Sequence, residues 1–341
     1  MAGRDRAPGA RGGTVRLARR AALGGFLGAA AYLAVRPAAA LPALFRPDGD
    51  LIGKLSWYVT EDGRTLLEVA QEQDLGILEI SAANPGIDPW VPGQGRPVLL
   101  PTAHLLPDAE RRGIVINKAE LRLYLFRDGG AVETHAIGVG RDGYDTPLGR
   151  TTIVRKTADP SWRPTAGTRA DHPDLPAVVG PGPDNPLGAY ALYLGWPTYL
   201  IHGTNAPFGV GRRASRGCIR MYPQTIAHLF DTLPTGTPVT VVDQPVKVGR
   251  ARGEVYVEIH PDSDQLDELE ATYRFRPHPA EAARTMLQER AGADLPRIDW
   301  DVVEAEMAAR RGIPVQVTRP ASWTADAKRG SKTKKGFGGL Y

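Results

Sequence analysis

Hydrophobic and polar positions alternate over much of the middle of the chain, which is typical of strands with one buried face. The clearest stretch is ELRLYLFR (120–127), in which three leucines fall on one face. The same reasoning predicts strands at 113–118, 131–140, 151–156, 189–194, 198–202 and 238–242. One helical pattern, at 224–233, stops before a Pro-Thr-Gly turn. The pattern predicts a mainly β domain over 112–244 with one helix near its end.

A smaller unit, placed at 55–102, precedes this domain. Thr65 and Glu68 have the spacing of a capping box, in which each side chain bonds the backbone of the other residue at a helix start. The predicted elements are a strand at 57–60, a helix from Thr65 to about Gln73, a second helix at 78–83 and a strand at 96–100. This order describes a βααβ unit.

A third region, 245–320, follows the β domain. It is predicted to hold a strand at 254–260 and helices at 279–291 and 301–311, and so to form a small α/β extension. The last segment, 321–341, is rich in Lys, Gly and Ser, which is typical of a disordered tail. Solvated charge is its expected role, and contact with an anionic envelope surface is the alternative.

The first forty residues predict export. An arginine-rich start is followed by an apolar run at 21–35 and by the sequence PAAA at 37–40, an A-x-A cleavage pattern. A cleaved signal peptide and an uncleaved inner-membrane anchor both remain open. Residues 1–40 carry seven Arg and one Asp, so the two ends of the chain account for its basic character. The body is mildly acidic, and no nucleic acid is expected among its partners.

Cys218 is the only cysteine in the chain. Cysteines of exported proteins usually pair, and a single one has no partner within its own chain. It is interpreted as a buried small hydrophobe, as half of an intermolecular disulfide, or as a reactive nucleophile. Counting cysteines does not separate these interpretations.

The surroundings of Cys218 favour the nucleophile. His202, sixteen positions earlier, ends a predicted strand and is a candidate base for the thiol. Arg216 and Arg220 are expected to favour the thiolate. Gly217 leaves room for a substrate to approach backbone N–H groups that face a developing oxyanion. Together these groups are what acyl transfer requires.

No other cluster suggests a cofactor. No group of His, Cys, Asp and Glu has metal-ligand spacing, and no phosphate-binding loop is present in the sequence. The other histidines are expected to be structural or exposed; they are His104, His135, His172, His228, His260 and His278. Neither a metal nor a cofactor is expected.

The cysteine segment resembles the signature of the YkuD-type L,D-transpeptidases. The matching residues are His202-Gly203-Thr204 and then Ser215-Arg216-Gly217-Cys218-Ile219-Arg220. DTPLG (145–149) resembles the TPxG turn of that family, and the segments at 159–165 and 175–192 resemble its periplasmic ErfK/YbiS-like branch. Many members carry histidine where this chain has Arg216. The βααβ unit, with NPGID and VLLP, resembles a LysM module that binds peptidoglycan glycan strands.

The resemblance implies a β-sandwich-like catalytic domain and a thiol-based reaction that needs no cofactor. Cys218 would attack the meso-diaminopimelate carbonyl of a stem tetrapeptide, and D-Ala would leave, protonated by His202. Arg220 would bind a substrate carboxylate or brace the loop, and Ser215 would orient it with Gly217. The substrate-binding group would also include Gly203, Thr204 and Asn205. Carbapenems, the family's characteristic inhibitors, would acylate the same cysteine.

The second substrate stays open at this point. A diaminopimelate amine would give a 3→3 crosslink, a lysine of an outer-membrane lipoprotein would give anchoring, and water would give hydrolysis by a carboxypeptidase or amidase. A Cys/His endopeptidase places its cysteine before its histidine, the reverse of this order. A non-enzymatic peptidoglycan-binding protein would be expected to lack Cys218 or His202. The resemblance implies cell wall biogenesis in the periplasm, and the βααβ unit is expected to be dispensable for turnover of small soluble muropeptides.

Overall fold

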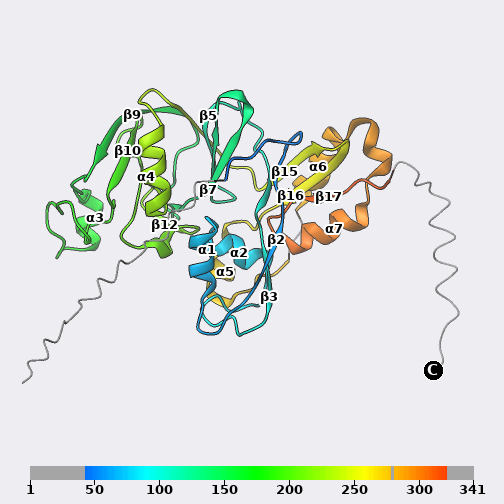
Figure 1. The fold of residues 1–341 in the computed structure, drawn as a ribbon, viewed down its shortest axis with the longest axis horizontal. Helices are drawn as coiled ribbons and strands as arrows, with labels where there is room; N and C mark the ends of the chain where they lie inside the picture. Colours follow the sequence, from blue (N-terminus) through cyan, green and yellow to red (C-terminus); the bar gives the residue numbers. More distant parts are fainter. Residues whose placement is uncertain (1–42, 278–279, 321–341) are drawn as a thin grey trace, which may run out of the picture. The chain divides into compact units, whose positions relative to one another are not determined.

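An eight-stranded mixed sheet forms the catalytic region of the computed structural model, which describes residues 43–277 and 280–320 (Figure 1). Its order is β13-β11-β10-β9-β14-β5-β6-β7. The strands are β5 (Gly113–Asn117), β6 (Arg122–Phe126), β7 (Val132–Ala136), β9 (Gly149–Ala158), β10 (Tyr190–Leu194), β11 (Leu200–His202), β13 (Ile219–Arg220) and β14 (Pro238–Val242). The pairs β14–β5 and β11–β13 are parallel and the others antiparallel. The prediction of a mainly β protein is confirmed, and this sheet is curled.

Helix α4 (Pro223–Thr232) follows the cysteine motif, as predicted. Proline at its first position suits a helix start, because the first backbone N–H groups have no partner within the helix. The helix lies against β10, and the rings of Phe230 and Tyr190 are 4.7 Å apart. Its buried face joins the same core as the sheet.

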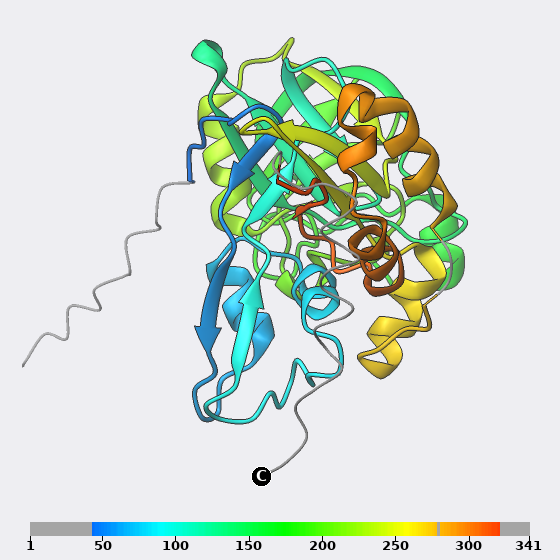
Figure 2. The same cartoon turned by 90° about the vertical axis from the view of Figure 1, so that its right-hand side faces the viewer.

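The βααβ order is also confirmed. It consists of β2 (Ser56–Val59), α1 (Leu66–Glu72), α2 (Ile77–Ala83) and β3 (Pro97–Leu100) (Figure 2). The capping box forms at α1: Thr65 Oγ1 accepts from Glu68 N at 3.2 Å, and Thr65 N donates to Glu68 Oε2 at 2.8 Å. Strands β2 and β3 pair antiparallel from Ser56–Leu100 to Val59–Pro97.

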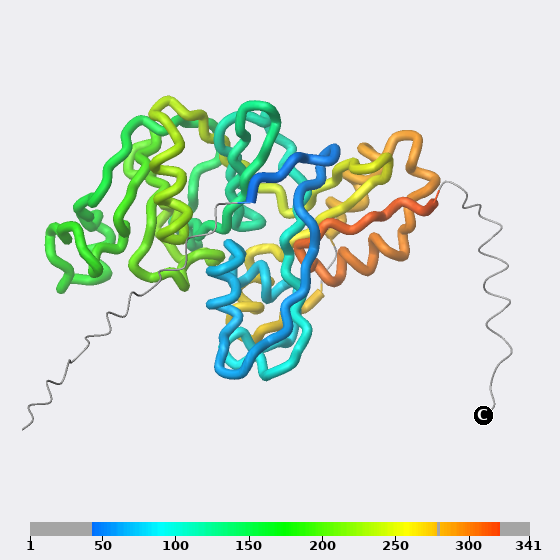
Figure 3. The backbone as a smooth tube through the Cα atoms, in the orientation of Figure 1, coloured from blue at the N-terminus to red at the C-terminus, as the bar shows by residue number. Residues whose placement is uncertain are grey.

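This βααβ unit is packed into the catalytic domain. The buried guanidinium of Arg122, on β6, lies 2.7 Å from Glu79 Oε2 on α2. Tyr222 donates its hydroxyl to Leu75 O at 2.9 Å, and the core residues of α1 and α2 belong to the same cluster as those of the sheet. Figure 3 shows the chain of α1 and α2 beside the segment that carries α5 (Ser263–Thr272), and α2 contacts α5.

The remaining elements include several that the pattern did not predict. The pattern did predict β16 (Glu254–Ile259), α6 (Glu281–Arg290) and α7 (Trp300–Ala309). The others are β1 (Leu51–Gly53), β4 (Ala103–Leu105), β8 (Val139–Gly140), α3 (Ala166–Asp171), β12 (Arg213–Ser215), β15 (Val246–Ala251), α5 and β17 (Val315–Gln316). The single strand expected at 131–140 is two strands, β7 and β8, because the chain leaves β6 to pair with β12.

Three sequence-based predictions fall outside the described residues: the export signal, the basic tail and the role of His278. Within the described ranges, no helix combines the length and apolar character that crossing a bilayer requires.

Candidate functional site

The pairing of β11 with β13 brings the two predicted catalytic residues to one place. The strands are parallel, with His202 opposite Arg220. Cys218 directly precedes β13, two positions from Arg220, and residues two apart on a strand share a face. Cys218, Arg220 and His202 therefore lie on the same side of this sheet edge. The sequence predicted that His202, Cys218 and Arg220 belong to one site, but it did not predict that β11 and β13 pair in parallel.

The ring of His202 is fixed by a backbone carbonyl. Its Nδ1 lies 2.6 Å from Gly203 O, and since a carbonyl only accepts, Nδ1 carries the proton and Nε2 keeps a lone pair. Burial, and then the charge of Arg220, lower the pKa of His202 to about 4, and hydrogen bonds to the backbone carbonyls of Gly203 and Leu187 oppose this only in part. The imidazole is therefore neutral at pH 7 and able to accept a proton.

Cys218 is a protonated thiol in this setting. It is half-buried, and its Sγ lies 3.4 Å from Thr198 O. Burial raises the pKa of the Cys218 thiol, and the Leu200 backbone and Arg220 oppose that shift without cancelling it. Arg220 favours the thiolate, as expected, but desolvation of the sulfur outweighs this cation, and Arg216 is not among the groups that shift the pKa of the thiol.

Arg216 points elsewhere. Its guanidinium forms an ion pair with Asp171 and lies 4.4 Å from the centre of the Tyr144 ring. This ion pair is partly exposed and holds the outer edge of the cysteine loop, residues 215–218. Arg216 is not among the groups that shift the pKa of the thiol.

Ser215 and Gly217 set the shape of the loop. Ser215 Oγ donates to Cys218 O at 2.6 Å and accepts from Gly217 N at 3.1 Å. Gly217 has a φ of 101°, and a Cβ there would lie 2.7 Å from the Tyr199 ring, so only glycine fits. The Gly217 N–H is thus engaged. The Cys218 N–H has no acceptor among the described residues.

Thr146 is a site residue that sequence reasoning missed. Its side chain is 1% exposed, donates to Gly217 O at 2.9 Å and accepts from Gly140 N at 3.1 Å. It therefore ties β8 to the cysteine loop. The only indication of this role in the sequence is the place of Thr146 in DTPLG, the segment that resembles the TPxG turn of the family.

The three residues after His202 differ in what they present. Gly203 N donates to Tyr190 O at 3.1 Å, and Thr204 Oγ1 accepts from Ala206 N at 2.9 Å, so both shape the turn. Thr204 is buried, whereas Asn205 is exposed. Of this predicted substrate-binding group, only the Asn205 side chain faces solvent freely.

Arg220 is a half-buried cation without a matching carboxylate. In the described part of the chain, no Asp or Glu lies within ion-pair distance of it, and its buried Nε has no hydrogen-bond partner. Burial lowers the pKa of Arg220, and the neighbouring thiol opposes that shift. A ligand carboxylate would satisfy this guanidinium.

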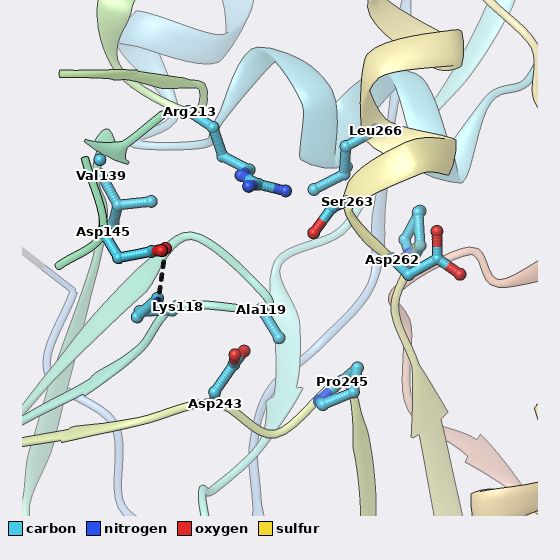
Figure 4. A pocket seen from close by; sticks show the side chains of 12 residues that line it. Lys118, Ala119, Val139, Asp145, Arg213, Asp243, Pro245, Asp262, Ser263 and Leu266 are labelled. Atoms are coloured by element: carbon cyan, nitrogen blue, oxygen red, sulfur yellow. Dashed lines mark hydrogen bonds and ion pairs between the residues drawn. The ribbon is translucent and has the colours of Figure 1, made fainter. Parts of the chain in front are cut away.

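A cavity of about 400 Å³ lies between the turn that holds Asp145 and the start of α5 (Figure 4). Gly140 and Asp145 line it: Gly140 N donates to Thr146 Oγ1, and Asp145 directly precedes Thr146 in the turn that binds Gly217. Lys118 and Asp145 form an ion pair of 3.5 Å on one wall, and residues at the start of α5 form the opposite wall. Its lining mixes both signs of charge and favours no single class of ligand.

One buried cluster has the composition of a metal site. His104, Glu120 and Glu258 come together from distant parts of the sequence. Lys247 Nζ already lies 2.5 Å from Glu120 Oε2 and 2.9 Å from Glu258 Oε1. One lysine therefore forms ion pairs with both carboxylates, and the cluster joins the sheet to the C-terminal region.

Comparison with known proteins decides the family. Residues 111–241 match the family model YkuD, the L,D-transpeptidase catalytic domain. The probable L,D-transpeptidase YcfS of Escherichia coli K12 is 40% identical over 86% of this chain and 93% of its own length. The chain belongs to the YkuD family of L,D-transpeptidases.

Two more relatives from the same organism support the finer assignment. The probable L,D-transpeptidase ErfK/SrfK is 39% identical over 80% of this chain and 89% of its own length. The probable L,D-transpeptidase YbiS is 39% identical over 78% and 88%. The predicted ErfK/YbiS-like branch is thus confirmed, and family membership indicates an L,D-transpeptidase that acts on peptidoglycan.

Proposed function

We propose that Cys218 forms a thioester with the meso-diaminopimelate carbonyl of a stem tetrapeptide and passes the acyl group to an amine. The main support is the hydrogen bond from His202 Nδ1 to Gly203 O, because it leaves the lone pair of Nε2 available as a base. His202 also shares a face of the sheet edge with Cys218. A neutral imidazole and a protonated thiol on one face of the same sheet edge suit general-base catalysis.

Each proton has a defined place in this mechanism. As the Sγ–C bond forms, the thiol proton moves to His202 Nε2 and the carbonyl becomes an oxyanion. When the tetrahedral intermediate collapses, the C–N bond to D-Ala breaks and the leaving amine takes that proton. The acceptor amine then attacks the thioester, loses a proton to His202, and the thiolate leaves and is reprotonated.

Backbone and side-chain groups of the loop supply the remaining roles. The unengaged Cys218 N–H is the candidate donor to the oxyanion. Ser215 and Thr146 hold the two carbonyls that flank it, at Cys218 and Gly217. Arg220 is positioned to bind a carboxylate of the stem peptide, and Asn205, which follows His202 on the neighbouring strand, to contact the peptide.

The acceptor is proposed to be a diaminopimelate amine or a lipoprotein lysine, with water as the hydrolytic alternative. The proposal places the enzyme in the periplasm, supported by the arginine-rich start and apolar run of the first forty residues. The βααβ unit is proposed to be LysM-like and to bind glycan strands, supported by its element order.

The test is incubation of the purified protein with a disaccharide-tetrapeptide, followed by mass spectrometry. The expected result is loss of D-Ala with a crosslinked dimer, and neither product with Cys218→Ala. Loss of D-Ala that yields tripeptide alone would indicate hydrolysis or the need for a protein acceptor, and addition of a lysine-ended acceptor peptide separates the two. D-Ala release by Cys218→Ala would overturn the proposed mechanism.

A further inference from the structure

Two exposed aromatic rings from distant parts of the sequence meet beside the catalytic face. Trp90 belongs to the loop between α2 and β3, and Phe208 to the turn that follows His202. Their ring centroids are 6.0 Å apart at an interplanar angle of 52°. Trp90 remains 47% exposed and Phe208 55% exposed, so the contact between them covers only part of each ring.

The backbone holds both rings in place. Asp88 Oδ1 accepts from Trp90 N at 2.8 Å and from Val91 N at 3.2 Å, and Pro89 O accepts from Leu66 N at the start of α1. Phe208 lies in a short 3₁₀ turn that begins just after Ala206, whose N–H is bonded to Thr204. Exposed aromatic side chains on fixed loops are pre-organised for a ligand.

The pair borders the proposed catalytic residues. Gly209, next to Phe208, lies against the guanidinium of Arg220: a Cβ on this glycine would be 2.8 Å from Arg220 Nη1. Arg220 in turn is opposite His202 and interacts with Cys218. Phe208 therefore belongs to a turn whose backbone contacts Arg220, next to the proposed site of acyl transfer.

We propose that Trp90 and Phe208 form a platform for a sugar ring of the glycan strand that carries the donor stem peptide. This inference rests on the proposed function and deepens it. The C–H face of a pyranose ring packs on the negative face of an aromatic ring. One ring comes from the βααβ unit and the other from the catalytic domain. A glycan strand bound to both rings would therefore hold the scissile carbonyl of its stem peptide at a fixed position relative to Cys218.

The stem peptide limits how far this platform can lie from Cys218, and its area favours a sugar. Two to three residues separate the glycan from the carbonyl that Cys218 attacks, a span of at most about 7 to 11 Å in an extended chain. The two rings together leave on the order of 200 Å² exposed, given about 150 to 250 Å² for each aromatic side chain. That area fits one or two sugar rings and is far below the roughly 800 Å² per partner of a stable protein interface.

The test compares two donors that differ only in the sugar: a disaccharide-tetrapeptide and the free tetrapeptide. D-Ala release gives kcat/KM for each, and their ratio is the sugar-dependent advantage. We expect a wild-type ratio well above one and a fall of about tenfold in Trp90→Ala and in Phe208→Ala, the size typical of a buried aromatic contact. The matched control is Trp57→Ala, since Trp57 is 66% exposed on β2 and has no aromatic partner among the described residues.

Several outcomes would overturn the platform: a wild-type ratio of one, a ratio unchanged in both variants, or an equal loss with both donors, which would mean that the rings only pack. A titration with an N-acetylglucosamine tetrasaccharide, followed by NMR, tests binding without turnover. Weaker binding in Trp90→Ala than in Trp57→Ala supports the platform, and equal binding contradicts it. If the wild type releases D-Ala from neither donor, the proposed function fails, and the titration still decides on the platform.

Discussion

The backbones of Gly76 and Gly211 are in direct contact. A Cβ on Gly211 would lie 2.3 Å from Gly76 Cα and 2.5 Å from Ile77 N. Gly76 caps α2 of the βααβ unit, and Gly211 precedes β12, the strand that leads into the cysteine loop. The unit therefore supports the catalytic loop. The structure opposes the expectation that its removal would spare turnover of soluble muropeptides.

Gly211→Ala tests this contact. Gly211 has a φ of 75°, so alanine would be strained, and its methyl group would also displace α2. We expect a loss of about 2 to 4 kcal/mol in the free energy of unfolding and slower acylation by a carbapenem. Gly63→Ala is the matched control, because Gly63 has a φ of 71° with no atom within 4 Å of the added Cβ. An equal decrease in Tm for Gly211→Ala and Gly63→Ala would show that the contact between Gly76 and Gly211 does not contribute to stability.

The state of His202 predicts the pH dependence of acylation. Catalysis requires the neutral imidazole, and burial lowers the pKa of His202 to about 4. We expect the single-turnover rate of carbapenem acylation to fall only as the pH approaches 4 and to be level near neutrality. A midpoint between pH 6 and 7 would show an imidazole of ordinary pKa and contradict the shift caused by burial.

The same shift affects stability. The pKa of His202 in the folded state, about 4, lies below the ordinary value of 6.5, so the unfolded chain binds more protons between these values. The contribution of His202 to stability is therefore complete above pH 6.5 and is lost as the pH falls toward 4. Chemical denaturation at several pH values, with His202→Gln as the control, measures this slope.

Local patterns predicted the elements that carry their own signals. Thr65 and Glu68 marked the start of α1, and alternation marked the strands of the sheet. Helix α5 was missed although Asp262 and Gln265 form its capping box, because its polar composition hides the apolar stripe. The burial of Cys218 depends on contacts far away in the sequence, so its raised pKa had no local signal.

Thr146→Val tests how the cysteine loop is held. Valine keeps the shape but removes the hydroxyl that bonds Gly217 O and Gly140 N, leaving two buried backbone groups without partners. We expect a loss of about 1 to 3 kcal/mol in stability and slower acylation, with partial recovery in Thr146→Ser. Thr152→Val is the control, since Thr152 lies exposed on β9. Wild-type acylation by Thr146→Val would exclude a positioning role.

Lys247 is expected to be the main cation that stabilises the buried carboxylates of Glu120 and Glu258. Burial alone would lower the pKa of Lys247, but Glu120 and Glu258 hold it above its usual value. Lys247→Met would remove the ammonium from two buried carboxylates that keep only their other hydrogen bonds, and we expect a loss of about 3 to 5 kcal/mol in the free energy of unfolding. Lys118→Met, which breaks one ion pair to an exposed carboxylate, should cost at most about 1 kcal/mol.

The same measurements separate a lysine-centred cluster from a metal site at His104, Glu120 and Glu258. If Lys247 supplies the charge, EDTA leaves the Tm of the wild-type protein unchanged, and added Zn²⁺ does not raise it. A bound metal would stabilise the folded state in proportion to its affinity, so its removal would lower the Tm by several degrees. A fall in Tm with EDTA that Zn²⁺ reverses, together with a mild effect of Lys247→Met, would assign the cluster to a metal instead.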